Sequence, residues 1–126
     1  MRKIFLSFLI VAPLIISGCS SITNLTPSKL QRNTSGFYQV EAAWHSRQRT
    51  IREDSMKPIV MVGNDTYEMR RVPLVENRWE TMVPVPADKD YIRYQFKFDY
   101  MVNAIPRALP DSKLSPEYKL TIVDKK

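Results

Sequence analysis

Few side chains in this chain could perform acid–base, nucleophilic or metal chemistry. The sequence has one histidine, His45, and one cysteine, Cys19. A zinc or haem site needs clustered His, Cys or carboxylate ligands, so neither site is expected. A serine nucleophile would need His45 beside it and an acid to orient the imidazole. His45 instead ends a strand-like pattern in a polar run, which indicates a solvent-exposed imidazole.

The carboxylates and glycines likewise do not indicate a catalytic or phosphate-binding site. The acidic residues form thinly scattered pairs: Glu53 with Asp54, Glu76 with Glu80, and Asp88 with Asp90. In a strand-rich chain such pairs are typical of turns and soluble surfaces, and they do not indicate a glycosidase dyad. The three glycines are not clustered, which excludes a glycine-rich phosphate loop. We therefore predict a protein that is not an enzyme and that uses no metal or other cofactor.

Length and charge limit the remaining possibilities. The chain has 126 residues, enough for one small domain, and a formal net charge of +6. Without Arg2 and Lys3, 17 basic and 13 acidic residues remain, a net charge of +4. This excess is mild and does not mark a nucleic-acid-binding protein. A single cysteine also excludes an internal disulfide.

The amino terminus has the composition of a signal for export. A basic start is followed by an apolar run over residues 4–16, too short to span a bilayer comfortably, which predicts a signal peptide over residues 1–18. The next residues, Ile16-Ser17-Gly18-Cys19, closely resemble the lipobox of bacterial lipoproteins. The resemblance implies that Cys19 becomes the first mature residue, with a diacylglycerol on its sulfur and an acyl chain on its amine. More than one acyl chain gives stable anchoring.

The residue after the lipidated cysteine directs sorting in enterobacteria, where aspartate retains the protein at the inner membrane. Here that residue is Ser20, so the resemblance implies the outer membrane, with the domain in the periplasm or at the cell surface. Residues 19–35 are rich in Ser, Thr and Asn, and this composition predicts a flexible tether after the lipid. As a coil, its sixteen residues after Cys19 would span about 20–24 Å. Alternatively, its apolar residues lie against the domain: Ile22, Leu25 and Leu30.

The strongest strand pattern lies between Tyr91 and Tyr100. Large apolar or aromatic residues occupy every even position, and polar residues occupy the odd positions 93–99. Because side chains alternate across a strand, this pattern predicts a long antiparallel strand with one buried face. Burial of the five large side chains is worth about 8–15 kcal/mol, so a second sheet must cover them. These side chains are Ile92, Tyr94, Phe96, Phe98 and Tyr100.

Other segments share this period. We expect strands from residue 36 to 44 and from 79 to 85, a hairpin over 58–72, and a closing strand at 120–122. Residues 36–126 are therefore predicted to form an all-β domain, an immunoglobulin-like β-sandwich of about seven antiparallel strands. The chain lacks the Cys-Trp-Cys framework of antibody-type domains. Trp44 and Trp79 are expected in the core.

Residues 67–100 resemble the core of glycogen-binding modules of the early-set immunoglobulin-like class. The matching pieces are Val72-Pro73-Leu74, Trp79, Val83-Pro84-Val85-Pro86 and the strand from Tyr94 to Asp99. The resemblance implies the fold, and it implies that Trp79 is a buried aromatic. The positions that hold sugar in those modules match Tyr67 or Met69, Gln95, and a position near Asn103. Two tryptophans and a lysine of the family are replaced there.

Two segments are candidate partner-binding sites. Residues 103–116 contain three prolines and read as a loop crossing the domain, and long loops on rigid sandwiches carry binding. A basic run precedes the hairpin and suits lipid phosphate, lipopolysaccharide or an acidic partner; alternatively it is a solvated loop balanced by Glu53 and Asp54. The candidate residues are Asn103, Ile105, Arg107 and Leu109 in the loop and Arg47, Arg49 and Arg52 in the run.

Three functions remain open from the sequence. The first is a non-enzymatic outer-membrane lipoprotein, attached to the membrane through Cys19, that contacts an envelope protein through exposed edge strands and the proline-containing loop. The second is a carbohydrate-binding module of the envelope. The third is a lipid or lipopolysaccharide binder.

Overall fold

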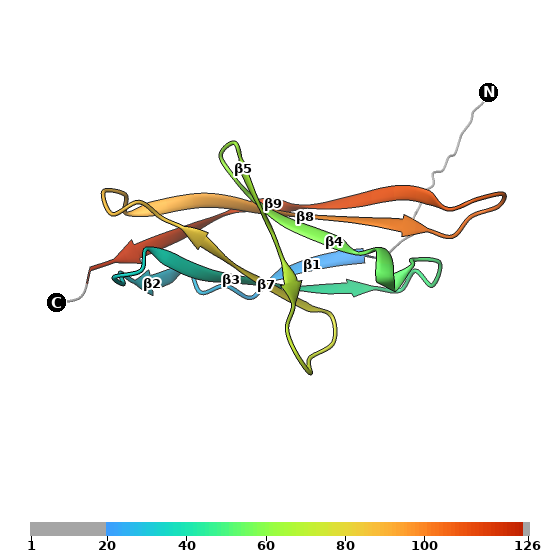
Figure 1. Cartoon of the computed structure of the whole chain (residues 1–126), viewed down its shortest axis with the longest axis horizontal. Helices are drawn as coiled ribbons and strands as arrows, with labels where there is room; N and C mark the ends of the chain where they lie inside the picture. The colour runs from blue at the N-terminus through green and yellow to red at the C-terminus, as the bar shows by residue number, and fades with distance from the viewer. Residues whose placement is uncertain (1–19, 125–126) are drawn as a thin grey trace, which may run out of the picture.

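The computed structural model describes residues 20–124, which form two packed β-sheets (Figure 1). The predicted signal peptide, residues 1–18, and Cys19 lie outside the described residues. Between residues 20 and 124 no helix is long and apolar enough to cross a membrane. The one helical element in this described range is a single 3₁₀ turn, η1 (Glu53–Ser55).

The two sheets hold nine strands. The four-stranded sheet has the order β1 (Ser20–Asn24), β3 (Phe37–Ser46), β7 (Arg78–Pro84), β6 (Arg70–Arg71). The five-stranded sheet has the order β2 (Lys29–Gln31), β9 (Leu109–Val123), β8 (Tyr91–Val102), β4 (Lys57–Val62), β5 (Asp65–Glu68). All neighbours are antiparallel except β2 and β9, which run parallel.

This strand order identifies the fold. Immunoglobulin domains place their first, second, fifth and fourth strands in one sheet, and their third, sixth and seventh in the other. Here β1-β3-β7-β6 and β9-β8-β4 follow that arrangement, with β5 extending the second sheet. The chain is an immunoglobulin-like β-sandwich, as the sequence predicts. Its described part has nine strands rather than about seven, and one pair is parallel.

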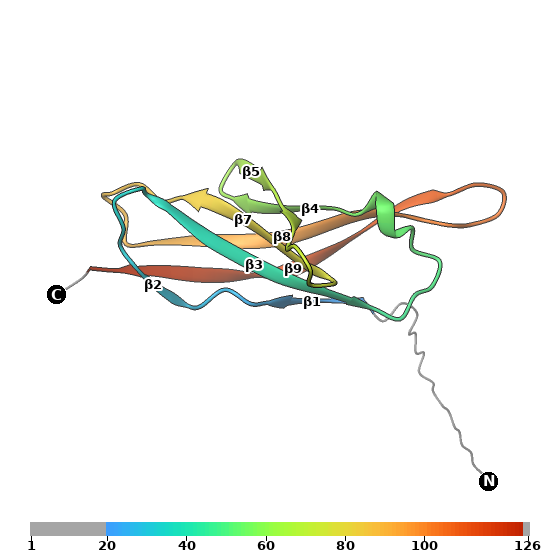
Figure 2. The same ribbon diagram turned by 60° about the horizontal axis from the view of Figure 1, so that its bottom comes forward.

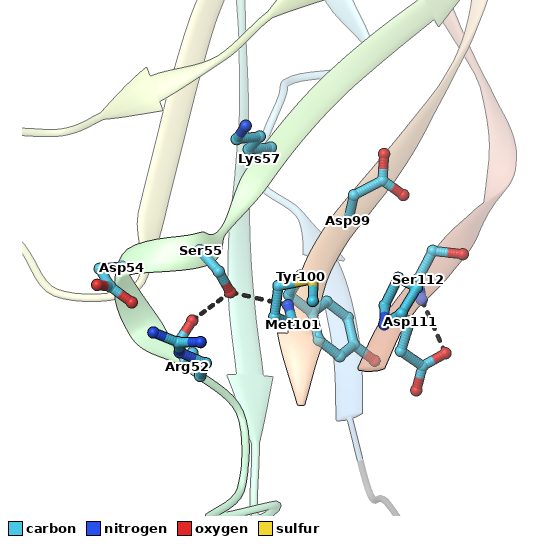
Figure 3. A pocket seen from close by; sticks show the side chains of 10 residues that line it. Arg52, Asp54, Ser55, Lys57, Asp99, Tyr100, Met101, Asp111 and Ser112 are labelled. Atoms are coloured by element: carbon cyan, nitrogen blue, oxygen red, sulfur yellow. Dashed lines mark hydrogen bonds between the residues drawn. The ribbon is translucent and has the colours of Figure 1, made fainter. Parts of the chain in front are cut away.

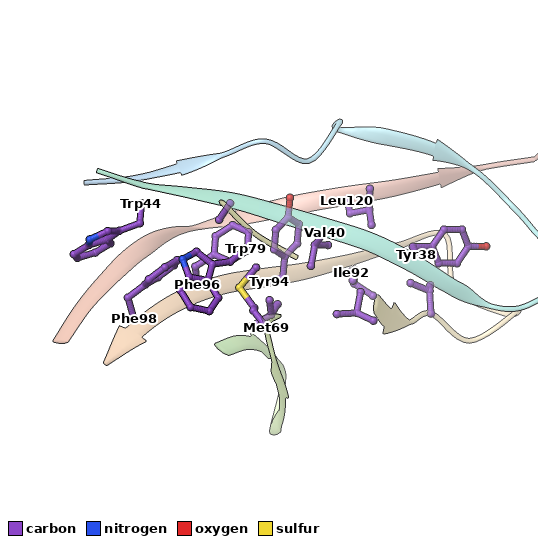
Figure 4. Close-up of a cluster of buried hydrophobic side chains, with 14 of the residues drawn as sticks. Tyr38, Val40, Trp44, Met69, Trp79, Ile92, Tyr94, Phe96, Phe98 and Leu120 are labelled. Carbon is purple, nitrogen blue, oxygen red and sulfur yellow. The ribbon is translucent and has the colours of Figure 1, made fainter. Parts of the chain in front are cut away.

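The aromatic row of β8 forms the centre of the core (Figure 4). Its five even-numbered side chains are all buried, and Phe96 and Phe98 are 0% exposed. Trp44 of β3 stacks on Phe98 with ring centroids 5.0 Å apart, while Trp79 of β7 meets the same ring edge-on at 6.3 Å. Both tryptophans are therefore core residues, as predicted, and aromatic contacts join the two sheets.

The predicted flexible tether is wrong for residues 20–35. Residues 20–24 form β1, which pairs with β3 from Ser20 opposite Ser46 to Asn24 opposite Ala42. Residues 29–31 form β2 beside the end of β9. The alternative prediction, that apolar residues of this segment lie against the domain, is confirmed for Ile22 and Leu30, which pack against the core. In edge strands this short, the exposed polar positions outnumber the apolar ones, so the composition resembles that of a linker.

The predicted 58–72 hairpin is correct only in its first half. β4 and β5 pair across a turn in which Gly63 adopts a φ of 60°, a conformation that suits glycine. The returning segment then leaves this sheet, because Met69 enters the core and residues 70–71 pair with β7 in the other sheet. One expected strand is therefore two short strands, one in each sheet.

The predicted 103–116 loop is also shorter than expected. β9 begins at Leu109, so the connection between β8 and β9 covers residues 103–108. Pro110 and Pro116 lie inside β9, where the strand pairs with β8 on one side only. A proline at an open edge sacrifices no ladder hydrogen bond. Pro116 also lies at the register shift of β9 against β8 near Gln95.

Candidate functional site

The candidate residues of the two predicted segments meet at one end of the sandwich, beyond which the β8–β9 hairpin projects (Figures 1 and 2). We call residues 46–52 and 103–109 the arginine-rich end. The first segment begins at the last residue of β3, and the second connects β8 to the first residue of β9 at the tip of their hairpin. β1 also begins here, since Ser20 lies opposite Ser46 and the two hydroxyl oxygens are 2.8 Å apart.

Backbone pairing joins the two segments. The amide of Asn103 donates to the carbonyl of Thr50 at 2.7 Å, and the amide of Arg52 donates to the carbonyl of Met101 at 2.9 Å. Between them Ile51 forms an antiparallel bridge with Val102 and is only 9% exposed. The residues after β3 thus act as a short additional strand along the base of the hairpin.

Ser55 fixes the next turn of the chain to the same hairpin (Figure 3). Its hydroxyl donates to the carbonyl of Arg52 at 2.5 Å and accepts a hydrogen bond from the amide of Met101 at 2.8 Å. Nearby, burial raises the pKa of Tyr100, and the Asp111 carboxylate raises it further. The base of the hairpin is therefore ordered and partly buried.

The cleft beside this base carries charges of both signs. Its lining includes Arg52, Lys57, Asp54, Asp99 and Asp111 (Figure 3). Over residues 20–124 no three His, Cys, Asp or Glu side chains are grouped so that they could hold a metal ion. The cleft therefore offers mixed-charge contacts for a polar ligand.

The two segments of the arginine-rich end carry charge of one sign, and Arg52 is the residue they share with the cleft. The segments contain four arginines and no acidic residue. All four side chains are exposed, and none forms an ion pair with another residue between 20 and 124. In the same two segments Ile105 is 99% exposed and Leu109 is 53% exposed. The four arginines are Arg47, Arg49, Arg52 and Arg107.

All seven partner-binding residues predicted from the sequence therefore lie at this end, and Cys19 lies outside the described residues. Leu109 is the first residue of β9 and not a loop residue. Sequence reasoning missed Ile51 and Ser55, which hold the two segments in place. The sequence does indicate that Ile51 is buried, since it is the one aliphatic residue in the polar stretch 45–55.

A second exposed feature is the outer edge of β9 over residues 109–120, which we call the open β9 edge. β2 pairs with β9 only at residues 121–123, so among the described residues no strand pairs with 109–120 on that side. Leu114 on this edge is 54% exposed. The prolines and lysines of the edge are features that limit unspecific strand pairing. They are Pro110, Lys113, Pro116 and Lys119.

The positions that match the sugar site of glycogen-binding modules do not converge. Tyr67 aligns across β4 with Val60 and Phe96, on the core face, whereas Gln95 aligns with Met61 on the outer face. Met69 is buried, and Asn103 lies at the arginine-rich end. His45 is exposed at the end of β3. Neither tryptophan presents an open ring face to solvent.

Comparison with known proteins adds little to this description. No protein-family model matches the chain, and no curated protein matches it. A solved structure of murine CRIg is similar with a TM-score of 0.42 and 12% sequence identity, covering 84% of this chain and 99% of that one. The fold assignment stands on the strand order of the two sheets, and a similarity of this size assigns no function.

Proposed function

We infer that this chain is a non-enzymatic lipoprotein of the bacterial outer membrane, anchored through Cys19, whose sandwich binds another envelope protein. The observation that supports a protein partner is the open β9 edge. It is the longest run of strand edge without a paired neighbour between residues 20 and 124, and it carries an exposed leucine.

The anchor is supported by the sequence before β1. A basic start, an apolar run and Ile16-Ser17-Gly18-Cys19 stand immediately before Ser20, the first residue of β1. Lipid on Cys19 would give stable attachment, because such a residue carries more than one acyl chain. The lone cysteine of the chain then has a defined role.

The open edge supports a partner that adds a strand. An extended peptide can pair with exposed backbone groups of an edge strand, and side-chain pockets then supply specificity. Pro110 and Pro116 confine such pairing to the segments between and after them, because neither residue has an amide hydrogen to donate. Leu114 would give the partner an apolar contact at the centre of the first segment.

Site-specific photo-crosslinking tests this proposal. A photoreactive residue at position 114 is expected to form a protein adduct in intact cells. The matched control is position 74, since Leu74 is also an exposed leucine but lies in the β6–β7 connection. Equal adducts from both positions, adducts with polysaccharide alone, or no adduct at position 114 would contradict a protein partner at this edge.

Lipidation is tested separately. Radiolabelled palmitate is expected to enter the wild-type chain and not the Cys19→Ser variant, and mass spectrometry is expected to find acyl groups on Cys19. An unmodified thiol at Cys19 would exclude the anchor and leave the edge to be judged by crosslinking alone.

A further inference from the structure

We propose that the arginine-rich end docks on the anionic phospholipid surface of the membrane that holds the anchor, with Ile105 entering the headgroup layer. This inference rests on the proposed lipidation of Cys19 for its orientation. It goes beyond that function by assigning a bilayer-contacting surface and a fixed orientation to the domain.

The position of β1 places the anchor at this end. Ser20 already pairs with Ser46, and consecutive Cα atoms are about 3.8 Å apart, so lipid on Cys19 would be attached within one residue of the sandwich. β1 then runs away from this end toward Asn24. With no spacer between lipid and strand, the segments beside Ser46 must lie close to the bilayer.

The charges of this end suit an anionic surface. Four exposed arginines lie in the two segments, without an acidic residue among them and without ion-pair partners in residues 20–124. Basic residues next to a membrane are attracted to anionic lipid. The guanidinium group also binds phosphate through two parallel hydrogen bonds. Asp54 and Asp111 line the cleft together with Arg52, and Glu53 lies in η1, so Arg47, Arg49 and Arg107 are the arginines outside the cleft.

The apolar residues at the tip also suit a bilayer. Ile105, in the connection between β8 and β9, is 99% exposed, and Leu109, the first residue of β9, is 53% exposed. Transfer of an isoleucine side chain out of water lowers the free energy, and the interfacial layer of a bilayer accepts apolar side chains flanked by arginine. Ile51 pairs with Val102 and Ser55 accepts from the amide of Met101, so the base of the hairpin needs no further ordering on docking.

A probe at position 105 measures docking directly. When lipid occupies Cys19, Ile105→Cys supplies the only free thiol of the chain. The full-length lipidated variant is labelled with an environment-sensitive fluorophore and reconstituted into vesicles of phosphatidylcholine, alone or mixed equally with phosphatidylglycerol. We expect a blue-shifted label that is protected from an aqueous quencher, with stronger protection in the anionic vesicles.

Two control positions give the comparison. Leu74→Cys places the label at another fully exposed aliphatic residue, and Asp88→Cys places it in the turn at the opposite end of the sandwich. Both labels should remain accessible to the quencher in either vesicle. If the label at 105 is as accessible as the label at 74 while mass spectrometry confirms lipid on Cys19, docking is wrong and the proposed lipoprotein stands.

Charge variants test the contribution of the arginines. Each change of Arg47, Arg49 or Arg107 to glutamine should lower the ratio of protected to accessible label about fivefold in anionic vesicles. The matched lysine variants should retain most of the effect, since they keep the charge. Arg93→Gln, on an exposed position of β8, should leave the ratio unchanged. Equal loss in Arg93→Gln would exclude a localised surface.

If mass spectrometry finds Cys19 without lipid, the proposed anchor fails and docking is judged by co-sedimentation of the full chain with the same vesicles. Binding to anionic vesicles that is weakened by Ile105→Ser and by the glutamine variants would support the docking surface. Absence of binding would overturn it.

Discussion

Where β8 begins and β9 ends, Arg32 donates to Asp124 at 2.6 Å, to Asp90 at 3.0 Å and to the carbonyls of Ala87 and Lys89. At the other end, four arginines are exposed and none forms an ion pair within residues 20–124. The hydrogen bond with Asp124 raises the pKa of Arg32, so the folded state favours the charged form.

The difference separates a structural arginine from ones available to a ligand. Arg32 joins the residues after β2, before β8 and after β9, and its guanidinium makes four hydrogen bonds to protein acceptors. The arginines of the opposite end lack such acceptors, so an external anion can meet them without breaking an internal contact. The residue type is the same, and only the surroundings assign the role.

The largest expected effect concerns the core that both ends share. Phe98→Ala should lower the free energy of unfolding by about 3–5 kcal/mol, because Phe98 is fully buried and contacts both tryptophans. Urea denaturation measures the change. A loss below about 1 kcal/mol would mean that the arginine-rich end is not built on this part of the core.

The Arg32 contacts come next. Arg32→Met should lower the melting temperature, since two carboxylates and two carbonyls lose a donor, and Arg32→Lys should restore only part of the loss because lysine lacks the planar fork. Arg49→Met, at the other end, is the matched control and should leave the melting temperature unchanged. Equal shifts in Arg32→Met and Arg49→Met would remove the contrast between the ends.

A smaller effect is expected at alkaline pH. Burial and Asp111 raise the pKa of Tyr100 above the unfolded value of 10.0, so its contribution to stability is complete below pH 10 and is lost as the pH rises through the folded pKa. Tyr100→Phe should therefore show a shallower decline of stability above pH 10. Asp111→Asn should lower the titration midpoint of Tyr100 in tyrosinate absorbance, and an unchanged midpoint would exclude Asp111 as a cause.

The smallest effect is expected at the tip. Ile105→Ser should change the free energy of unfolding by less than about 0.5 kcal/mol, because the side chain is 99% exposed and packs against nothing in the fold. A clear loss of stability in urea would show that Ile105 contributes to folding, and it would weaken its assignment as a membrane contact.

Patterns with a period of two were read correctly from the sequence. β8, β3 and β7 each place alternate residues in the core, because one sheet face is buried and the other is not. The short strands at the sheet edges were missed. β1, β2 and the proline-containing half of β9 are polar, since an edge strand that is largely exposed needs few apolar residues.

The sequence by itself determined a two-sheet sandwich, an aromatic core and the lipobox-like segment before Ser20, because alternation and short motifs are local properties. It also named the residues of both candidate segments. Only the tertiary structure decided that residues 46–52 and 103–109 form one surface, beside the start of β1. That arrangement depends on pairing between residues some fifty positions apart, such as Ile51 with Val102, and no local pattern specifies such pairing.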